Sequence, residues 1–337
     1  MVFLSIVLNQ LSIDTRNCSN NFTKINQIYL AFRPNRRRVN LYLTHNMNFF
    51  NQKNTIKLGL ALFVAVGIYA CSSTKPGGKS ASGHPETKLG WKLGSQAYTF
   101  KEFTFFDAVR KIDSCDLRFV EAFPGQTIGG GIAGKMGPDM DDATRKAVLA
   151  KLKESNVQMK AFGVTGAGDE AGWIKLFEFC KAMGVETITS EPNEKDLPLI
   201  SKLCDKYDIR MAIHNHPDPS HYWNPDVVLN AIKGQSSRIG ACADIGHWVR
   251  SGLDPVECLK KLEGHVFHSH MKDLHEKGKG GHDVHWGEGV SNIAGVIAEM
   301  KRQNFKGMIS AEYEYNWKSN SQDVAASVVN FRELLRK

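Results

Sequence analysis

IRMAIHNH (Ile209–His216), IGACADIGH (Ile239–His247) and VFHSHMKD (Val266–Asp273) are three stretches that share one pattern. Each begins with apolar residues, as a buried strand does, and ends in histidine or carboxylate side chains. Segments with helical periodicity separate them. Strands that alternate with helices are typical of a parallel sheet. The carboxyl ends of parallel strands lie at one edge, so the sequence predicts that these polar residues gather there.

The same alternation extends over residues 89–337 and predicts eight strands. Eight β/α units in about 250 residues favour a single (β/α)8 TIM barrel over an open doubly wound sheet. No GxGxxG motif follows the first strand, and the glycine-rich segment Gly125–Gly137 comes after the second. We interpret that segment as a mobile loop over a site, with a phosphate cradle as the alternative. The predicted strands are Lys92–Phe100, Leu117–Phe123, Val157–Val164, Val185–Glu191, Ile209–His216, Ile239–Ile245, Val266–Lys272 and Gly307–Glu314.

The N-terminal 88 residues differ in composition from the barrel. Residues 1–46 fit neither a signal nor a folded domain, so we expect translation to start at Met47. Residues 47–70 contain basic Lys53 and Lys57 followed by a 13-residue apolar run, Leu58–Ala70, the order found in a secretory signal. A run of this length is too short for a spanning helix, which needs about 20 residues. Residues 71–88, rich in Ser, Gly, Lys and Pro, predict a flexible tether.

Net charge gives no sign of a nucleic-acid partner. Residues 1–70 hold eight Lys/Arg against one acid, Asp14, which is +7 of the total formal charge of +8. The remainder is close to neutral and has no overall attraction to phosphate backbones.

The segment IYAC, which ends at Cys71, resembles the lipobox of bacterial lipoproteins. The resemblance implies that Cys71 is acylated and becomes the first mature residue. A lipid-anchored protein of the cell envelope would follow, on the periplasmic side or the cell surface. The alternative is an ordinary signal peptide cut near Ala70.

Ligand-type side chains end five consecutive predicted strands. Buried together without partners they would be costly to desolvate, and a divalent cation removes that cost by coordinating carboxylates and neutral imidazoles. Nitrogen and oxygen donors without thiolates suit Mn, Mg, Co or Zn. The sequence therefore predicts one divalent metal ion at the barrel mouth. These strand-end residues are Glu191, His214, His216, Asp244, His247, His268, His270, Lys272, Asp273, Glu312 and Glu314.

Residues 89–337 resemble the xylose isomerase-like barrels, a superfamily that includes sugar epimerases, hydroxypyruvate isomerases, inosose dehydratases and endonuclease IV. The resemblance implies that His214, Asp244, His270 and Glu312 hold the metal. Many members have Glu where this chain has His214, which removes one carboxylate of the two-glutamate epimerase mechanism. Glu191 is expected to restore the charge as a further ligand. The motifs are QAYTF (Gln96–Phe100), VEAFPGQ (Val120–Gln126), HNH (His214–His216), DIGH (Asp244–His247), HMKD (His270–Asp273) and Glu312.

The chemistry expected at this site is proton abstraction from a carbon next to a carbonyl, through an enediolate. His216 is the candidate base, because histidine titrates near neutral pH. His247 and Lys272 are expected to bind hydroxyls or the developing oxyanion. Glu121, Gln126, Trp248 and His268 are assigned to substrate binding, and Trp223 and Trp286 are further candidates for stacking on a sugar.

An exported location favours a non-phosphorylated sugar or glycoside. Isomerisation or epimerisation and β-elimination from a 3-keto-glycoside both fit such a substrate. Two other classes stay open: a phosphodiesterase similar to endonuclease IV, and a sugar-binding lipoprotein without catalysis.

Overall fold

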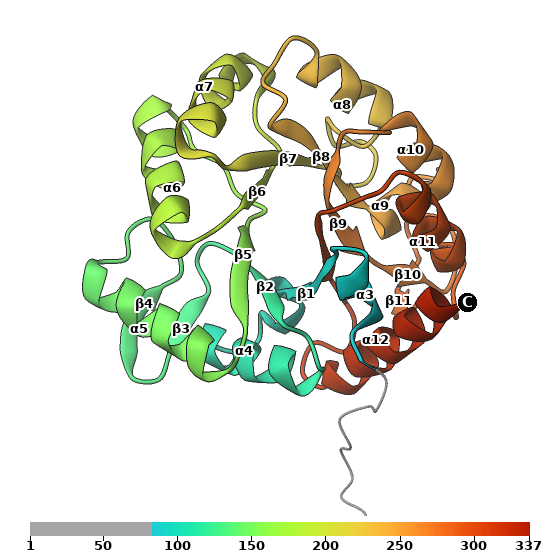
Figure 1. The fold of residues 1–337 in the computed structure, drawn as a ribbon, viewed down its shortest axis with the longest axis horizontal. Helices are drawn as coiled ribbons and strands as arrows, with labels where there is room; N and C mark the ends of the chain where they lie inside the picture. The colour runs from blue at the N-terminus through green and yellow to red at the C-terminus, as the bar shows by residue number, and fades with distance from the viewer. Residues whose placement is uncertain (1–82) are drawn as a thin grey trace, which may run out of the picture. The chain divides into compact units, whose positions relative to one another are not determined.

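The computed structural model describes residues 83–337. The predicted upstream extension, the signal peptide, the lipidation site Cys71 and the first two thirds of the tether lie outside the described residues. The end of the predicted flexible tether is wrong, because Pro85–Lys88 form helix α3 and Glu86 of this helix is buried. Eight parallel strands close into a barrel in the order β1-β12-β9-β8-β7-β6-β5-β2. Figure 1 shows the strands as an inner ring with helices around it. The predicted (β/α)8 barrel is therefore confirmed.

All eight predicted strands form, but each ends earlier than the sequence pattern indicates. The first strand stops at Gln96, and Ala97–Phe100 form the short helix η1. At each carboxyl end the chain leaves the sheet for a loop, so several predicted site residues follow a strand. The barrel strands are β1 (Lys92–Gln96), β2 (Phe119–Ala122), β5 (Gln158–Phe162), β6 (Thr187–Ser190), β7 (Arg210–His214), β8 (Ile239–Asp244), β9 (Val266–Met271) and β12 (Met308–Ala311).

The helices begin and end where their sequences provide caps. The Asp169 side chain accepts from the Gly172 amide at the start of α6, and Gly184 ends that helix with φ +74°. In the described chain the helices are α3 (Pro85–Lys88), α4 (Phe105–Ser114), α5 (Asp142–Glu154), α6 (Glu170–Met183), η2 (Glu194–Asp196), α7 (Leu197–Tyr207), α8 (Pro225–Ile232), α9 (Ile245–Arg250), α10 (Pro255–Lys261), α11 (Ile293–Arg302) and α12 (Ser321–Arg336). None of the helices between residues 83 and 337 has both the length and the apolarity to cross a membrane.

Close packing of the strands requires small residues at their starts. A Cβ on Gly94 of β1 would lie 2.3 Å from the Phe119 carbonyl oxygen, and one on Gly240 of β8 would lie 2.2 Å from that of His265. Every residue of β6 and β8 is buried. The strands thus have helices on one side and a packed interior on the other, as in parallel barrels.

The glycine-rich segment is an ordered hairpin, which corrects the prediction of a mobile loop. Strands β3 (Thr127–Gly129) and β4 (Ile132–Lys135) pair antiparallel, and Gly130 and Gly131 form the turn with positive φ. A Cβ on Gly130 would lie 2.7 Å from the Phe106 ring of α4. Glycine is needed here for a tight turn against a helix.

A second hairpin follows β9, made of β10 (Asp273–Leu274) and β11 (Asp283–Val284). The Asp273 carboxylate accepts from the amides of Gly287, Gly289 and Ser291 at 2.8–3.0 Å. Asp273 therefore organises the loop beyond the hairpin and makes no ion pair with its neighbour Lys272.

Candidate active site and metal centre

Four ligand-type side chains meet at the carboxyl ends of neighbouring strands. His214 ends β7, Asp244 ends β8, His270 lies near the end of β9 and Glu312 directly follows β12. Each offers one donor atom, and these atoms all lie within 4.8 Å of one another. Strand register produces the meeting, since His214 pairs with Cys242 and Asp244 with His270. The four residues that the family resemblance implies as metal ligands therefore lie close together in the structure.

The donor atoms of this set face one another. His270 Nδ1 lies 2.9 Å from Glu312 Oε2 and 3.7 Å from Asp244 Oδ2, and His214 Nε2 lies 3.4 Å from Asp244 Oδ2. Asp244 Oδ1 is already engaged, because it accepts from the His247 amide at the start of α9. Its other oxygen is left for the centre.

The donor set fits a divalent cation because each residue contributes one unsatisfied atom. His214 Nε2, Asp244 Oδ2, His270 Nδ1 and Glu312 Oε2 are all buried and lack a partner with hydrogen-bonding geometry. Buried polar atoms normally have partners. Two carboxylate oxygens and two imidazole nitrogens are ligands that Mn, Mg, Co or Zn accept.

Lys272 lies beside this set and is fully buried. Its Nζ is 3.0 Å from Asp244 Oδ2, 2.8 Å from Glu312 Oε2 and 3.4 Å from His247 Nε2. Burial by itself would lower the pKa of Lys272, but the charges of Asp244 and Glu312 raise it well above the usual value. The ammonium group of Lys272 therefore neutralises the carboxylates of Asp244 and Glu312. The predicted contact of Lys272 with a substrate hydroxyl stays a prediction.

Glu191 lies behind His214 and outside the four-residue set. Its Oε1 is 2.9 Å from His214 Nδ1 and also contacts His216 Nδ1. Burial would raise the pKa of Glu191, yet hydrogen bonds from the two imidazoles lower it to about 2. Glu191 is predicted to be a metal ligand; in the structure it lies outside the four-residue set and contacts the nitrogen of His214 that points away from that set. A separate possible donor group of Glu191, His214 and His216 does exist.

His216, the predicted base, is the accessible member of the cluster. Its side chain is 51% exposed, and both its Nδ1 and its amide contact Glu191 Oε1. The ring stacks on His247 at 5.2 Å between centroids. A carboxylate on Nδ1 leaves Nε2 as the nitrogen available for proton transfer.

Arg250 fixes the proton position on His247, a role that sequence reasoning missed. Its Nη1 is 3.0 Å from His247 Nδ1. A guanidinium only donates, so Nδ1 accepts and the neutral ring carries its proton on Nε2. Burial lowers the pKa of His247 well below the usual value, which keeps the ring neutral. Arg250 also contacts Asp283 and Glu314, so it links α9 to the β10–β11 hairpin and to the loop after β12.

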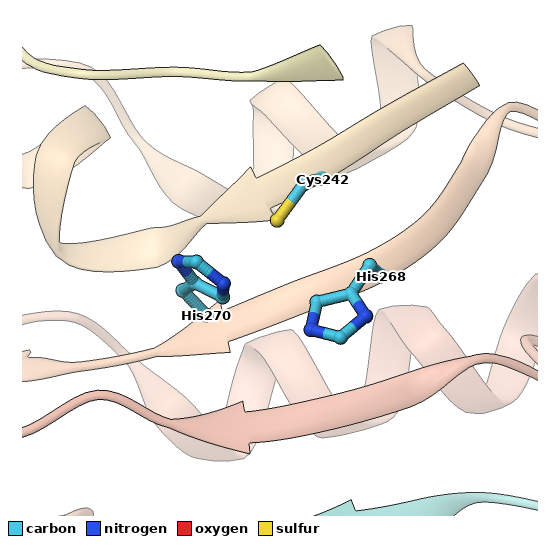
Figure 2. A group of neighbouring side chains, drawn as sticks. All are labelled: Cys242, His268 and His270. Carbon is cyan, nitrogen blue, oxygen red and sulfur yellow. The ribbon is translucent and has the colours of Figure 1, made fainter. Parts of the chain in front are cut away.

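A second layer of polar residues lies deeper in the barrel. Figure 2 shows Cys242 projecting from β8 toward the strand that carries His268 and His270. Burial raises the pKa of Cys242 to about 12, so it is a neutral thiol. Glu121 contacts both imidazoles, each Nε2 lying 2.8 Å from its Oε2. Burial would raise the pKa of Glu121, but His270 and His268 hold it well below its usual range.

The four residues assigned to substrate binding all lie in the interior. Glu121 and His268 are fully buried, and Trp248 is 1% exposed. Gln126 donates to the carbonyl oxygen of Phe103 and braces the chain after β1. The predicted candidate Trp286 is buried as well and packs on Phe331. The structure therefore shows these side chains in supporting contacts, and their contact with substrate stays a prediction.

Aromatic side chains that the sequence analysis did not select follow the ends of three strands. Tyr98 (after β1) packs edge to face on Phe123 (after β2) at 5.3 Å and on Trp317 (after β12) at 5.7 Å. Lys101 Nζ lies 3.6 Å from the Trp317 ring. All are partly exposed. They follow the same barrel end as the donor set.

A cavity of about 260 Å³ lies at the opposite end, where strands begin. Its charged side chains are largely paired with each other, as Glu186 is with Lys92 at 3.0 Å and Lys160 at 2.8 Å. Arg210 packs on the Phe267 ring. In parallel barrels this end supports stability, and the chemistry lies at the other.

The fold is a closed parallel barrel whose mouth holds a group of His and carboxylate side chains that could bind a metal ion. The chain belongs to the xylose isomerase-like TIM barrels, since the sequence model of that family matches residues 109–334. The sequence has no significant match among curated proteins.

Solved structures agree with this fold. An uncharacterised protein from Parabacteroides distasonis is 35% identical, with 72% of this chain and 98% of that chain covered and a TM-score of 0.60. A D-tagatose 3-epimerase-like protein is 17% identical, with 73% and 97% covered and a TM-score of 0.59. A xylose isomerase-like barrel from Mycobacterium smegmatis, solved with magnesium, is 11% identical, with 73% and 96% covered and a TM-score of 0.58.

Proposed function

We propose that this protein is a metal-dependent sugar isomerase, epimerase or lyase that removes a proton from a carbon next to a carbonyl. The observation that carries the proposal is the convergence of four buried donor atoms, from two imidazoles and two carboxylates, within 4.8 Å of one another. His214, Asp244, His270 and Glu312 would hold the ion. A bound divalent ion polarises a carbonyl and stabilises negative charge that develops on its oxygen.

His216 is the base in this proposal, and it takes the proton on Nε2. Glu191 holds Nδ1, which orients the ring and stabilises the imidazolium that forms. His247 Nε2 faces the donor set, 3.5 Å from Asp244 Oδ2 and 3.4 Å from Lys272 Nζ, because Arg250 occupies Nδ1. In this proposal a substrate oxygen that binds beside the donor set would approach this nitrogen.

The substrate class proposed is a non-phosphorylated sugar or glycoside, including 3-keto forms. Tyr98, Phe123 and Trp317 provide a partly exposed aromatic surface for the apolar face of a sugar ring or for an aglycone. Lys272 and Arg250, the cations beside the donor set, are already engaged with carboxylates, whereas Lys101 lies on the aromatic surface itself. The preference for a neutral substrate rests on the expected export of the chain, away from cytoplasmic sugar phosphates.

Metal analysis of the purified protein, followed by NMR of glucosides and their 3-keto forms in deuterated buffer, tests the proposal. Deuterium at C2 without loss of the aglycone supports an isomerase or epimerase. Release of the aglycone with a 2-hydroxy-glycal supports the lyase. Absence of both metal and exchange on every sugar would contradict the enzyme assignment.

We also propose that the mature protein is lipid-anchored in the cell envelope through Cys71. Mass analysis of the native protein is expected to show a diacylated N-terminal cysteine, and Cys71→Ser is expected to release the protein from membranes. Peptides from residues 1–46 in the same digest would contradict translation from Met47.

A further inference from the structure

Glu121, on β2, is a fully buried carboxylate that makes contacts with three other barrel strands. Its Oε1 accepts from Thr189 Oγ1 of β6 at 2.5 Å, and its Oε2 accepts from Ser310 Oγ of β12 at 2.9 Å. The Nε2 atoms of His268 and His270, both on β9, lie 2.8 Å from the same Oε2. The polar atoms around this carboxylate all act as donors to it.

The contact with His270 determines which nitrogen faces the donor set. A carboxylate without a proton only accepts, so Nε2 of His270 must carry the hydrogen. The other nitrogen, Nδ1, faces the donor set, with Glu312 Oε2 at 2.9 Å and Asp244 Oδ2 at 3.7 Å. Glu191 and His214 repeat the arrangement with the nitrogens exchanged, since Glu191 holds Nδ1 and leaves Nε2 toward the centre.

We propose that Glu121 is a positioning residue for the metal centre: by holding Nε2 of His270 it fixes the orientation and tautomer of that ring and so sets metal affinity. The inference rests on the proposed metal-dependent function. Glu121 has 0% exposure, so it acts through His270 and does not touch substrate. Carboxylate partners of ligand histidines typically contribute 10–100-fold to metal affinity.

The test compares Glu121→Gln with Ser269→Ala. Ser269 lies on β9 between the two histidines, is fully buried and donates to the Ala243 carbonyl oxygen, so its loss removes a buried hydrogen bond of the same strand without touching Glu121. Affinity for Mn²⁺, Co²⁺ and Zn²⁺ is measured by competition with a chelator. Glu121→Gln is expected to weaken binding by about 10–100-fold, and Ser269→Ala to leave it unchanged.

A spectroscopic readout separates positioning from a purely structural role. The visible d–d spectrum of the Co²⁺-loaded protein is expected to change in Glu121→Gln and to stay the same in Ser269→Ala, whatever their thermal stabilities. Should Glu121→Gln not fold, Thr189→Val removes only the hydroxyl that braces Oε1. This variant is expected to weaken metal binding in the same direction by a smaller factor.

The outcomes distinguish this inference from the proposed function. If the unaltered protein binds metal while the Glu121 and Thr189 variants keep its affinity and Co²⁺ spectrum, the positioning role is wrong and the metal-dependent function stands. If the unaltered protein binds none of the three ions, the proposed function itself fails and the inference fails with it.

Discussion

His270 has contacts on both of its ring nitrogens, one in each polar layer. Nε2 contacts Glu121 in the interior and Nδ1 faces the donor set. The imidazoles His214 and His216 likewise share Glu191. The chemistry of the site therefore depends on which nitrogen of each histidine is engaged, and predictions at the residue scale concern these rings.

Replacing His216 with Ala is expected to lower the rate of substrate deuterium exchange by about 10²–10⁴-fold, the usual contribution of a general base. Metal content should be retained, because His216 is not one of the four converging donors. Exchange by NMR and metal by mass spectrometry of the same sample are the measurements. Loss of the metal would make His216 a ligand instead.

Metal uptake is expected to release protons and to weaken as pH falls. Burial would lower the pKa of His214 and His270, but hydrogen bonds and charges from neighbouring groups, including Asp244, raise both above 6.5. Each ring must be neutral to bind an ion, so protons compete with the metal at and below the raised pKa values. Calorimetry in buffers of different ionisation enthalpy measures the release, and buffer-independent heats would contradict it.

In the metal-free protein the raised pKa values of His214 and His270 make the fold more stable at low pH, whereas metal binding is stronger at high pH. Their contribution is fully present below pH 6.5 and is lost as pH rises through the folded-state pKa values.

The strand and helix pattern predicted that polar residues at the strand ends gather at the barrel mouth, and the family resemblance selected His214, Asp244, His270 and Glu312 among them. The sequence pattern did not determine how far each side chain lies below the mouth of the barrel. Glu121 and His268 share the inward face, but they lie below the mouth and support it. The contacts of Glu191 and Arg250 depend on loop geometry, which has no periodic sequence signal.

At the scale of elements, the β10–β11 hairpin is joined to the site through Asp283 and Arg250. Arg250 Nη2 lies 3.2 Å from Asp283 Oδ2, and Asp283 Oδ1 is buried without a hydrogen-bond partner. Burial raises the pKa of Asp283 to about 7, in spite of Lys272 and Arg250, which lower it. The packing of the hairpin is therefore sensitive to pH near neutrality.

Asp283→Asn is expected to flatten the pH dependence of stability between about pH 4 and 7. The folded-state pKa is raised, so the contribution of Asp283 is fully present below its ordinary value of 3.8 and is lost as pH rises through about 7. An amide stays neutral over this range. Thermal denaturation of both proteins across the window measures the effect, and parallel curves would show that Asp283 does not titrate there.

The existence and order of the strands and of the helices between them could be predicted, because the spacing of apolar residues along the chain is that of a parallel barrel. The β3–β4 hairpin was not, because its ordering depends on contact with Phe106 of α4, a residue far from the turn in sequence. The strand ends were predicted too late, because the residues that follow each strand continue its alternation of apolar and polar side chains in the sequence.

At the scale of the whole molecule, the first and last described helices are joined by a buried ion pair. Arg332 of α12 contacts Glu86 of α3 at 2.8 Å and Asp116, which follows α4, at 2.6 Å. Glu86 and Arg332 are 2% and 4% exposed. The start and the end of the barrel are thereby held together.

Arg332→Ala is expected to lower the free energy of unfolding by about 3–5 kcal/mol, because Glu86 would be left as a buried charge without its partner. The double variant Arg332→Ala with Glu86→Gln should recover part of this loss. Denaturant unfolding of the three proteins gives the comparison. A loss below about 1 kcal/mol, typical of exposed pairs, would mean that solvent reaches the pair.

The four converging donors are spread over almost a hundred residues, from His214 to Glu312, and lie on or directly after four different strands. No short segment of the chain can therefore capture an ion before these strands have paired. For a chain that crosses a membrane unfolded, loading with metal follows folding on the far side. The ion found in the native protein would then reflect which metals are abundant where folding is completed, and expression in another compartment could yield a correctly folded barrel that contains a different ion.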